Sequence, residues 1–118
     1  MGGSSAVNTC IALRGQPYDF DGWRLANWRY EDCLKAFMAI ENDLDQPGAR
    51  HGSDGPLPVR RYRPDEWVAW QTAFMEACVQ QGFDEIPDHN TPDTSGAGPH
   101  AMNKQNGRRI NAAEAWLR

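Results

Sequence analysis

The sequence predicts an α+β structure that is mostly helical with one or two short strands, and three observations carry this prediction. Apolar residues recur at helical spacing near residues 30 to 43 and 65 to 81. Strand-like runs are short and lie around 56 to 61 and 99 to 105. The stretches between them are rich in glycine and proline, which is typical of loops. The 118 residues have the length of one ordinary domain.

The composition indicates a soluble, globular protein. Five tryptophans, four phenylalanines and three tyrosines supply bulky apolar side chains, while a mean hydropathy of -0.73 indicates a polar surface. No window approaches the roughly 18 apolar residues that a membrane span needs, and none resembles a secretory signal. We therefore expect a cytoplasmic protein without a membrane span.

The charge and the cysteines argue against further classes. A net charge of -4 speaks against a nucleic-acid partner, because such binding needs clustered cations. The one basic cluster, Arg60-Arg61-Tyr62-Arg63, is expected at a solvated edge. Cys10, Cys33 and Cys78 lack CxxC spacing, so we expect reduced, buried thiols and neither a disulfide framework nor a zinc site.

The N-terminal segment MGGSSAVN passes at once into the apolar, helix-competent stretch AVNTCIAL, which we expect to be buried. Gly2 and Gly3 lack Cβ atoms, so their N–H groups can closely approach an anion or a planar ring, and Ser4 and Ser5 add hydroxyl donors. GGSS is equally typical of a flexible or tag-derived string. A turn at residues 14–17 then leads to one or two helical turns before Trp23.

The two main helices are predicted by their apolar faces. In YEDCLKAFMAIEND, one face carries Tyr30, Cys33, Leu34, Phe37 and Met38. We expect this face in the core, although a partner could also bind it. After a loop at 46–55 and an edge-like strand, Pro64 suits the first turn of the second helix. Its face carries Trp67, Trp70, Phe74 and Cys78, and Gly82 is expected to end it.

The remaining third of the chain begins with a predicted surface loop over residues 84–99, which contains three prolines. A strand then leads to a turn at Asn106-Gly107. Asn111 and Glu114 form a capping pair that opens a short C-terminal helix, AAEAWLR. So long a loop, and a helix of about two turns at the chain end, suggest that part of the structure is missing.

The three histidines raise the question of a metal site. His51, His89 and His100 have acidic residues near them in sequence, namely Asp54, Asp88 and Asp93. All of them fall in predicted loops without the i, i+4 spacing of a helical metal site. We therefore predict no metal site, and the sequence alone supports no catalytic triad.

Four motifs, in order, resemble the glucose-methanol-choline (GMC) family of FAD-dependent oxidoreductases. The string GGSSAVNTCIALRGQPYDFDGW is similar to the family's flavin-contacting segment. The matching positions are Gly2, Gly3, Ser4, Ser5, Asn8, Ala12, Gly15 and Asp21. NWRYEDCLKAF, HGSDGPLPV and NGRRINAAEAWL resemble three further family motifs, so that the resemblance covers nearly the whole chain. It is strongest toward choline dehydrogenases and oxidases.

The resemblance implies FAD as cofactor and a small alcohol as substrate, with hydride transfer from the alcohol carbon to the flavin. It places the backbone of residues 2–5 along the ribityl and pyrophosphate of FAD, and Asn8, Thr9, Cys10 and Ile11 beside the isoalloxazine ring. Some members attach FAD covalently through a histidine where this chain has Val7, so we expect non-covalent binding here. His51 matches a motif position where a structural role is expected.

Two hypotheses follow from the resemblance. In the first, residues 1–118 are a single partial domain of a parent α/β FAD-binding fold. Residues 1–29 form its flavin-contacting segment, and residues 30–118 belong to the junction with the substrate domain. The family's GxGxxG loop and catalytic histidine have no counterpart here, so this chain alone is expected to be inactive. In the second, the chain is a stand-alone, non-enzymatic helical binding module. Either could form a homo-oligomer through exposed apolar faces.

Overall fold

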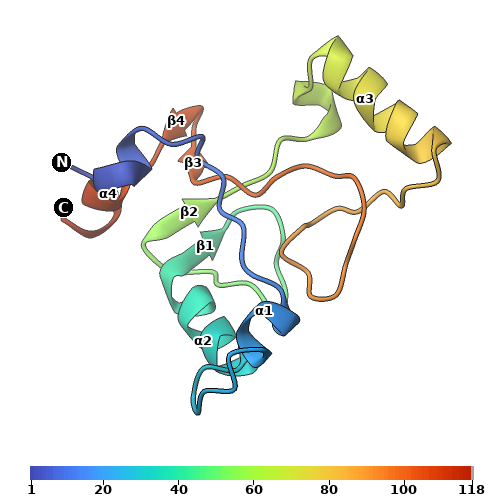
Figure 1. The fold of residues 1–118 in the computed structure, drawn as a ribbon. Helices are drawn as coiled ribbons and strands as arrows, with labels where there is room; N and C mark the ends of the chain where they lie inside the picture. Colours follow the sequence, from blue (N-terminus) through green and yellow to red (C-terminus); the bar gives the residue numbers. More distant parts are fainter. Residues whose placement is uncertain (118) are drawn as a thin grey trace.

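Two main helices and two small two-stranded sheets organise the computed structural model, which describes residues 1–117 (Figure 1). The sequence predicted this mixed, mostly helical composition correctly. The helical elements are η1 (Gly3–Ala6), α1 (Pro17–Asp21), α2 (Tyr30–Ile40), η2 (Pro64–Glu66), α3 (Ala69–Gln80) and α4 (Ala112–Trp116). The strands are β1 (Glu41–Asp43), β2 (Leu57–Val59), β3 (Lys104–Gln105) and β4 (Arg108–Arg109).

Helix α2 forms where the apolar spacing predicted it, with Tyr30 and Leu34 buried on its inner face. It ends at Ile40, so the prediction of helix over residues 41–43 is wrong. These residues form β1, which pairs in parallel with β2 in a register that sets Glu41 against Leu57 and Asp43 against Val59. From this strand, the carboxylate of Glu41 pairs with Arg14 and that of Asp43 pairs with Arg61.

The predicted strand over 56–61 is confirmed in its three central residues, where β2 lies beside β1. Pro58 has no N–H and so limits the ladder that β2 can form. Directly after β2, Arg60 pairs with Met102 in an antiparallel bridge, and Met102 also pairs with Ile11. The N-terminal segment, β2 and the C-terminal region therefore lie side by side.

The second main helix begins later than predicted. Residues 64–66 form η2, the chain is extended at Trp67 and Val68, and α3 starts at Ala69. The indole N–H of Trp67 donates to the carbonyl of Tyr62 at 3.0 Å, which holds the chain away from a continuous helix. Gly82, with φ of 87°, ends α3 as predicted. No residue of α3 is buried, and Figure 1 shows the helix standing apart from the rest of the described chain.

Part of the predicted surface loop at 84–99 is in fact interior: Ile86, Asp88 and Asn90 are buried. The N–H of Ile86 donates to the carbonyl of Ala97, and the N–H of Ala97 donates to the carbonyl of Asp84, both at 2.9 Å. These bonds fold the segment on itself. A Cβ atom on Gly98 would lie 2.0 Å from the carbonyl oxygen of Ile86, so only glycine permits this close approach.

The C-terminal region forms a hairpin that was only partly predicted. The predicted strand over 99–105 shrinks to β3, and β4 was not predicted. The turn at Asn106-Gly107 is confirmed; both residues have positive φ, as a tight two-residue hairpin turn requires. The capping pair is also confirmed, because the side chain of Asn111 accepts a hydrogen bond from the N–H of Glu114 at 3.0 Å. Arg118, the last residue of the predicted helix, lies outside the described residues.

The N-terminal stretch AVNTCIAL differs from its prediction. Of its residues only Ala6, the last residue of η1, is helical, and from Val7 the chain runs through a turn and a bend to an isolated bridge at Ile11. Cys10 is buried, as expected of a free thiol, whereas Val7 is 83% exposed. Cys33 and Cys78 are only half-buried. The short helix expected before Trp23 is confirmed as α1. Within residues 1–117, no helix has both the length and the apolar character needed to cross a bilayer.

Candidate functional site

The two N-terminal glycines adopt backbone conformations that other residues rarely adopt. Gly2 has φ of 112° and Gly3 has φ of 57°. A Cβ atom on Gly2 would lie 2.9 Å from Oδ1 of Asn111, so α4 and its cap pack directly on this glycine. A Cβ atom on Gly3 would meet nothing within 4 Å, so one face of this backbone is open to an incoming group.

The serines that follow differ in role. Ser5 is tied into the structure: its hydroxyl donates to the carbonyl of Gly2 and accepts a hydrogen bond from the N–H of Ala112 at 2.9 Å. Ser4 is exposed. The segment is therefore fastened to the start of α4 through Gly2 and Ser5, while Gly3 and the hydroxyl of Ser4 face outward.

Among the residues after η1, Cys10 is buried, whereas its neighbour Asn8 is exposed. The side-chain Oδ1 of Asn8 accepts a hydrogen bond from the N–H of Cys10 at 2.9 Å. Cys10 has a positive φ of 66°, and its carbonyl accepts from the N–H of Asn103 at 2.8 Å. This local turn aims Thr9 and Ile11 toward the opposite side of the segment.

Thr9 and Ile11 line a groove of about 600 Å³ between the N-terminal segment, α3 and residues 96–102. The groove wall is mainly aromatic and apolar; it includes Tyr62, Trp67, Trp70, Phe74, Met75 and Phe83. The sequence-predicted cofactor residues thus divide into three places. Gly2, Ser5 and Asn8 contact α4 and the hairpin, with Gly3 and Ser4 exposed beside them. Thr9 and Ile11 line the groove, and Cys10 is buried.

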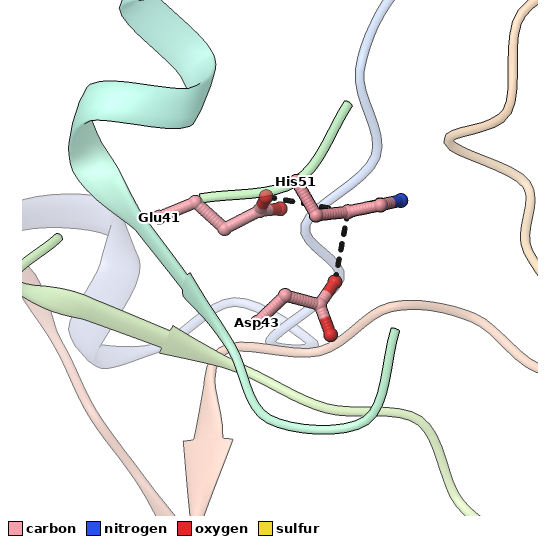
Figure 2. A group of neighbouring side chains, drawn as sticks. All are labelled: Glu41, Asp43 and His51. Carbon is pink, nitrogen blue, oxygen red and sulfur yellow. Dashed lines mark hydrogen bonds and ion pairs between the residues drawn. The ribbon is translucent and has the colours of Figure 1, made fainter. Parts of the chain in front are cut away.

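A network of buried charges lies at the ends of β1 and β2. His51 Nδ1 is 3.0 Å from Oδ2 of Asp43 and 3.3 Å from Oε2 of Glu41, the two contacts drawn in Figure 2. His51 Nε2 is 3.2 Å from Oδ2 of Asp88. Arg61 is 2.9 Å from Asp43 and 2.5 Å from Asp88 through its Nη1 and Nη2 atoms. Sequence analysis missed this network, because its members lie far apart in the chain.

Arg61 corrects a sequence prediction. It belongs to the basic cluster expected at a solvated edge, yet it is only 3% exposed. Burial alone opposes the charge of a guanidinium. Here hydrogen bonds and the nearby charges of Asp43 and Asp88 outweigh burial and raise the pKa of Arg61. The cation is therefore an internal partner of carboxylates.

The carboxylates hold His51 in its protonated form. Hydrogen bonds to Asp43, and then to Asp88 and Glu41, raise the pKa of His51 to about 11. Burial raises the pKa of Asp88, but His51 and Arg61 outweigh this effect and lower it to about 2. The pKa of Asp43 is likewise lowered: burial opposes the shift, and bonds to His51 and Arg61 overcome it. All three groups are charged at neutral pH.

Glu41, Asp43 and His51 offer ligand atoms within 4.8 Å of one another, which is a spacing that a metal ion could use. However, Nδ1 of His51 is paired with Asp43 at 3.0 Å and with Glu41 at 3.3 Å. Arg14 also occupies Oε2 of Glu41 at 2.5 Å, and Arg61 occupies both oxygens of Asp43. In this arrangement, His51 and Arg61 are paired with the carboxylates of Asp43 and Asp88. A structural role for His51 stays a prediction.

The network fixes the end of the N-terminal segment. Arg14 donates through Nη1 to the carbonyl of Arg50 at 2.8 Å, in addition to its ion pair with Glu41. The backbone N–H of Arg14 donates to the side chain of Asn90, whose Nδ2 donates back to the carbonyl of Ala12 at 3.0 Å. Residues 12–14 are therefore tied to both β1 and the 84–99 segment.

The fold and site together define a class of protein. Over its whole length, residues 1–118, the sequence matches the GMC oxidoreductase family, and the chain belongs to this family. FAD is the cofactor that the family implies. The residues present fit such a group in two respects: Gly3 and Ser4 present open backbone and a hydroxyl, and the groove beside Thr9 and Ile11 is mainly apolar.

Named relatives show which GMC oxidoreductases the chain resembles. The chain is 41% identical to pyridoxine 4-oxidase of Microbacterium luteolum over 99% of its own length and 24% of the relative's. It is 37% identical to an oxygen-dependent choline dehydrogenase of Brucella ovis over its whole length and 22% of the relative's. The crystal structure of pyridoxine 4-oxidase from Mesorbium loti superposes with a TM-score of 0.90 at 34% identity, over 98% of this chain and 23% of that one. The chain thus spans about a quarter of the relatives it matches.

Proposed function

We propose that this chain supplies one wall of the FAD site in an oxidoreductase that acts on the CH–OH group of a small alcohol. The observation that carries the proposal is the segment of residues 2–11, which presents open glycine backbone at one end and groove-lining side chains at the other. Similarity to named pyridoxine and choline oxidoreductases supports the alcohol as substrate class.

Different residues of the segment would contact different parts of FAD. The backbone of Gly2 and Gly3 and the hydroxyl of Ser4 would meet the ribityl and pyrophosphate, and Asn8 to Ile11 would lie beside the ring. Bound FAD would supply the acceptor for a hydride leaving the alcohol carbon. Val7, exposed and without a nucleophilic atom, leaves the binding non-covalent. Residues 30–118 would then hold this wall at the junction with the substrate domain.

A chimera tests the proposal. Residues 1–118 replace the matched quarter of the Microbacterium luteolum pyridoxine 4-oxidase, and the purified chimera is assayed for bound FAD and for anaerobic flavin reduction by pyridoxine. We expect FAD at close to one per chain and reduction by the alcohol. A folded chimera that purifies without flavin and takes up none would overturn the proposal.

A glycine pair provides the matched control within the chimera. Gly3→Ala adds a methyl group at a positive φ facing open space, in the proposed FAD wall. Gly82→Ala adds the same group at a positive φ of 87°, also in open space, at the end of α3. We expect the Gly3 variant to lose FAD affinity and the Gly82 variant to keep it. Equal losses would indicate a general effect of strain.

The exposed face of α3 favours a second candidate, a stand-alone binding module. Trp70 is 70% exposed and Phe74 is 59% exposed, so the helix could dock on a partner or on a second copy. This candidate expects the chain by itself to be monodisperse and to unfold cooperatively, with its apolar face covered by a homodimer. Sedimentation and urea unfolding of the purified chain test it. Aggregation, or a monomer that binds hydrophobic dye strongly, would exclude it.

A further inference from the structure

Arg109, in β4, holds the N-terminal segment from a distance of about a hundred residues along the chain. Its Nη1 donates to the carbonyl of Ser5 at 3.1 Å and to Oδ1 of Asn8 at 2.7 Å. Its Nη2 donates to the backbone carbonyl of Asn8 at 2.5 Å. One guanidinium therefore binds three oxygens on two residues of the segment that the family resemblance places against FAD.

These bonds fix the orientation of the Asn8 amide. Its Oδ1 accepts from Arg109 and from the N–H of Cys10, which fills the two lone pairs of that oxygen. Within residues 1–117, nothing accepts a hydrogen bond from Nδ2 of Asn8, and the residue is exposed. The amide is thus held with its N–H₂ group outward as a donor. The same bonds support the positive φ of Cys10.

The β3–β4 hairpin and its hydrogen bonds hold the backbone of Arg109 in place. Arg109 pairs with Lys104 across β3 and β4, next to the tight turn at Asn106-Gly107. Below it, Asn103 donates through Nδ2 to the carbonyl of Ile110 at 2.6 Å. The backbone N–H of Asn103 also donates to the carbonyl of Cys10. The hairpin therefore contacts the segment at both ends of the turn that Arg109 closes.

We infer that Arg109 is a positioning residue for the cofactor wall. It acts through Ser5 and Asn8, whose backbone and amide it holds in one conformation before FAD arrives. The planar guanidinium of arginine can donate to all three oxygens at once. The ammonium of lysine is a single point donor and cannot reach all three. The effect of Arg109 on FAD binding rests on the proposed function, whereas its effect on the order of residues 5–10 does not.

The first experiment measures this ordering without the cofactor. Hydrogen exchange of the purified chain is compared for wild type, Arg109→Ala and Arg109→Lys. Arg108→Ala is the matched control, because the Arg108 side chain is 71% exposed and pairs with Glu114. We expect exchange in residues 5–10 to rise roughly tenfold or more in Arg109→Ala, because charge-assisted bonds are lost there. Exchange in α2 should not change, and guanidinium ion should restore part of the protection.

The second experiment follows quenching of FAD fluorescence by the same variants. We expect Arg109→Ala to raise the dissociation constant for FAD roughly tenfold. The constant for Arg109→Lys should lie between those of wild type and Arg109→Ala, and that of Arg108→Ala should match wild type. Wild-type exchange rates in Arg109→Ala would overturn the inference. If Arg109→Ala unfolds as a whole, exchange in Arg109→Lys decides: unchanged protection of residues 5–10 overturns the inference. Loosening of the segment in a chain that never binds FAD would count against the proposed function alone.

Discussion

Individual charged residues in this chain have roles that their sequence neighbours do not indicate. Arg61 and Arg63 belong to one basic cluster, yet Arg61 is buried among carboxylates and Arg63 is exposed with Asp65. Strand alternation would place both side chains on one face, so the sequence does not distinguish them. Their surroundings in the fold decide the difference, because Asp43 and Asp88 come from β1 and from the 84–99 segment.

The first prediction concerns Arg61. Arg61→Met keeps most of the side-chain volume but, among the residues that the structure describes, leaves the carboxylates of Asp43 and Asp88 with His51 as their buried cationic partner. Removing one partner of a buried ion pair destabilises a protein by about 3–5 kcal/mol. We expect a loss of this size in the free energy of unfolding from urea titration. Arg63→Met, an exposed control, should change it by less than about 0.5 kcal/mol. Equal effects would contradict the burial of Arg61.

The second prediction concerns the pH dependence that His51 produces. Its pKa is about 11 in the folded chain and ordinarily 6.5, so the folded state binds the proton more tightly. This stabilisation is fully present below pH 6.5 and is lost progressively as the pH rises to about 11. We expect the Tm of wild type to fall between pH 7 and 10. The Tm of His51→Gln should be lower at pH 6 and flatter over that range; parallel curves would contradict the expectation.

In acid, the change of stability with pH that Asp88 produces has the opposite sign. The pKa of Asp88 is lowered from 3.8 to about 2, so its contribution is present above 3.8 and lost as the pH falls through 2. A variant Asp88→Asn should therefore show a weaker decline of Tm between pH 4 and pH 2. Asp65→Asn, at an exposed position, provides the comparison and should decline as wild type does.

Periodicity predicted the elements well and their limits poorly. The start of α2, the caps Gly82 and Asn111, and the Asn106-Gly107 turn depend on neighbouring residues, and all are confirmed. The helix-to-strand change at Glu41 depends on arginines elsewhere in the fold, so local spacing could not reveal it. The burial of Ile86, Asp88 and Asn90 likewise depends on contacts with distant segments, which the turn-forming residues around them do not indicate. Arg109 lies in the string NGRRINAAEAWL, which resembles a family motif, but no role was predicted for it because its contacts with residues 5 and 8 depend on the fold.

The third prediction tests how residues 84–99 are folded. Gly98→Ala would place a Cβ atom 2.0 Å from the carbonyl oxygen of Ile86, a backbone atom that cannot easily move. Such overpacking destabilises by about 1–3 kcal/mol. We expect a lower Tm and a reduced free energy of unfolding. Gly48→Ala adds the same methyl group where nothing lies within 4 Å, and should leave both unchanged. Tolerance of alanine at 98 would show that the segment is more open.

The whole molecule combines a well-connected body with an unpartnered helix. The chain spans about a quarter of its relatives, and α3 presents aromatic side chains along a groove that Thr9 and Ile11 also line. In the family interpretation, this groove belongs to the cofactor wall and its junction. In the binding-module interpretation, it is a docking surface. Both give the exposed aromatics a role outside the stability of the chain itself.

The fourth prediction separates a role in stability from a role in docking. Trp70→Ser with Phe74→Ser removes two aromatic side chains that are 70% and 59% exposed. Because little of their surface is buried here, the free energy of unfolding of the isolated chain should change by less than about 0.5 kcal/mol. Binding of a hydrophobic dye should fall, because two of the exposed aromatic side chains that line the groove are gone. Val59→Ala, at a position 2% exposed, should instead lower stability by about 1–3 kcal/mol.

In the chimera, the surrounding chain would cover the groove, so the same double substitution should become destabilising. A large loss of stability in the isolated chain would show that α3 already packs there.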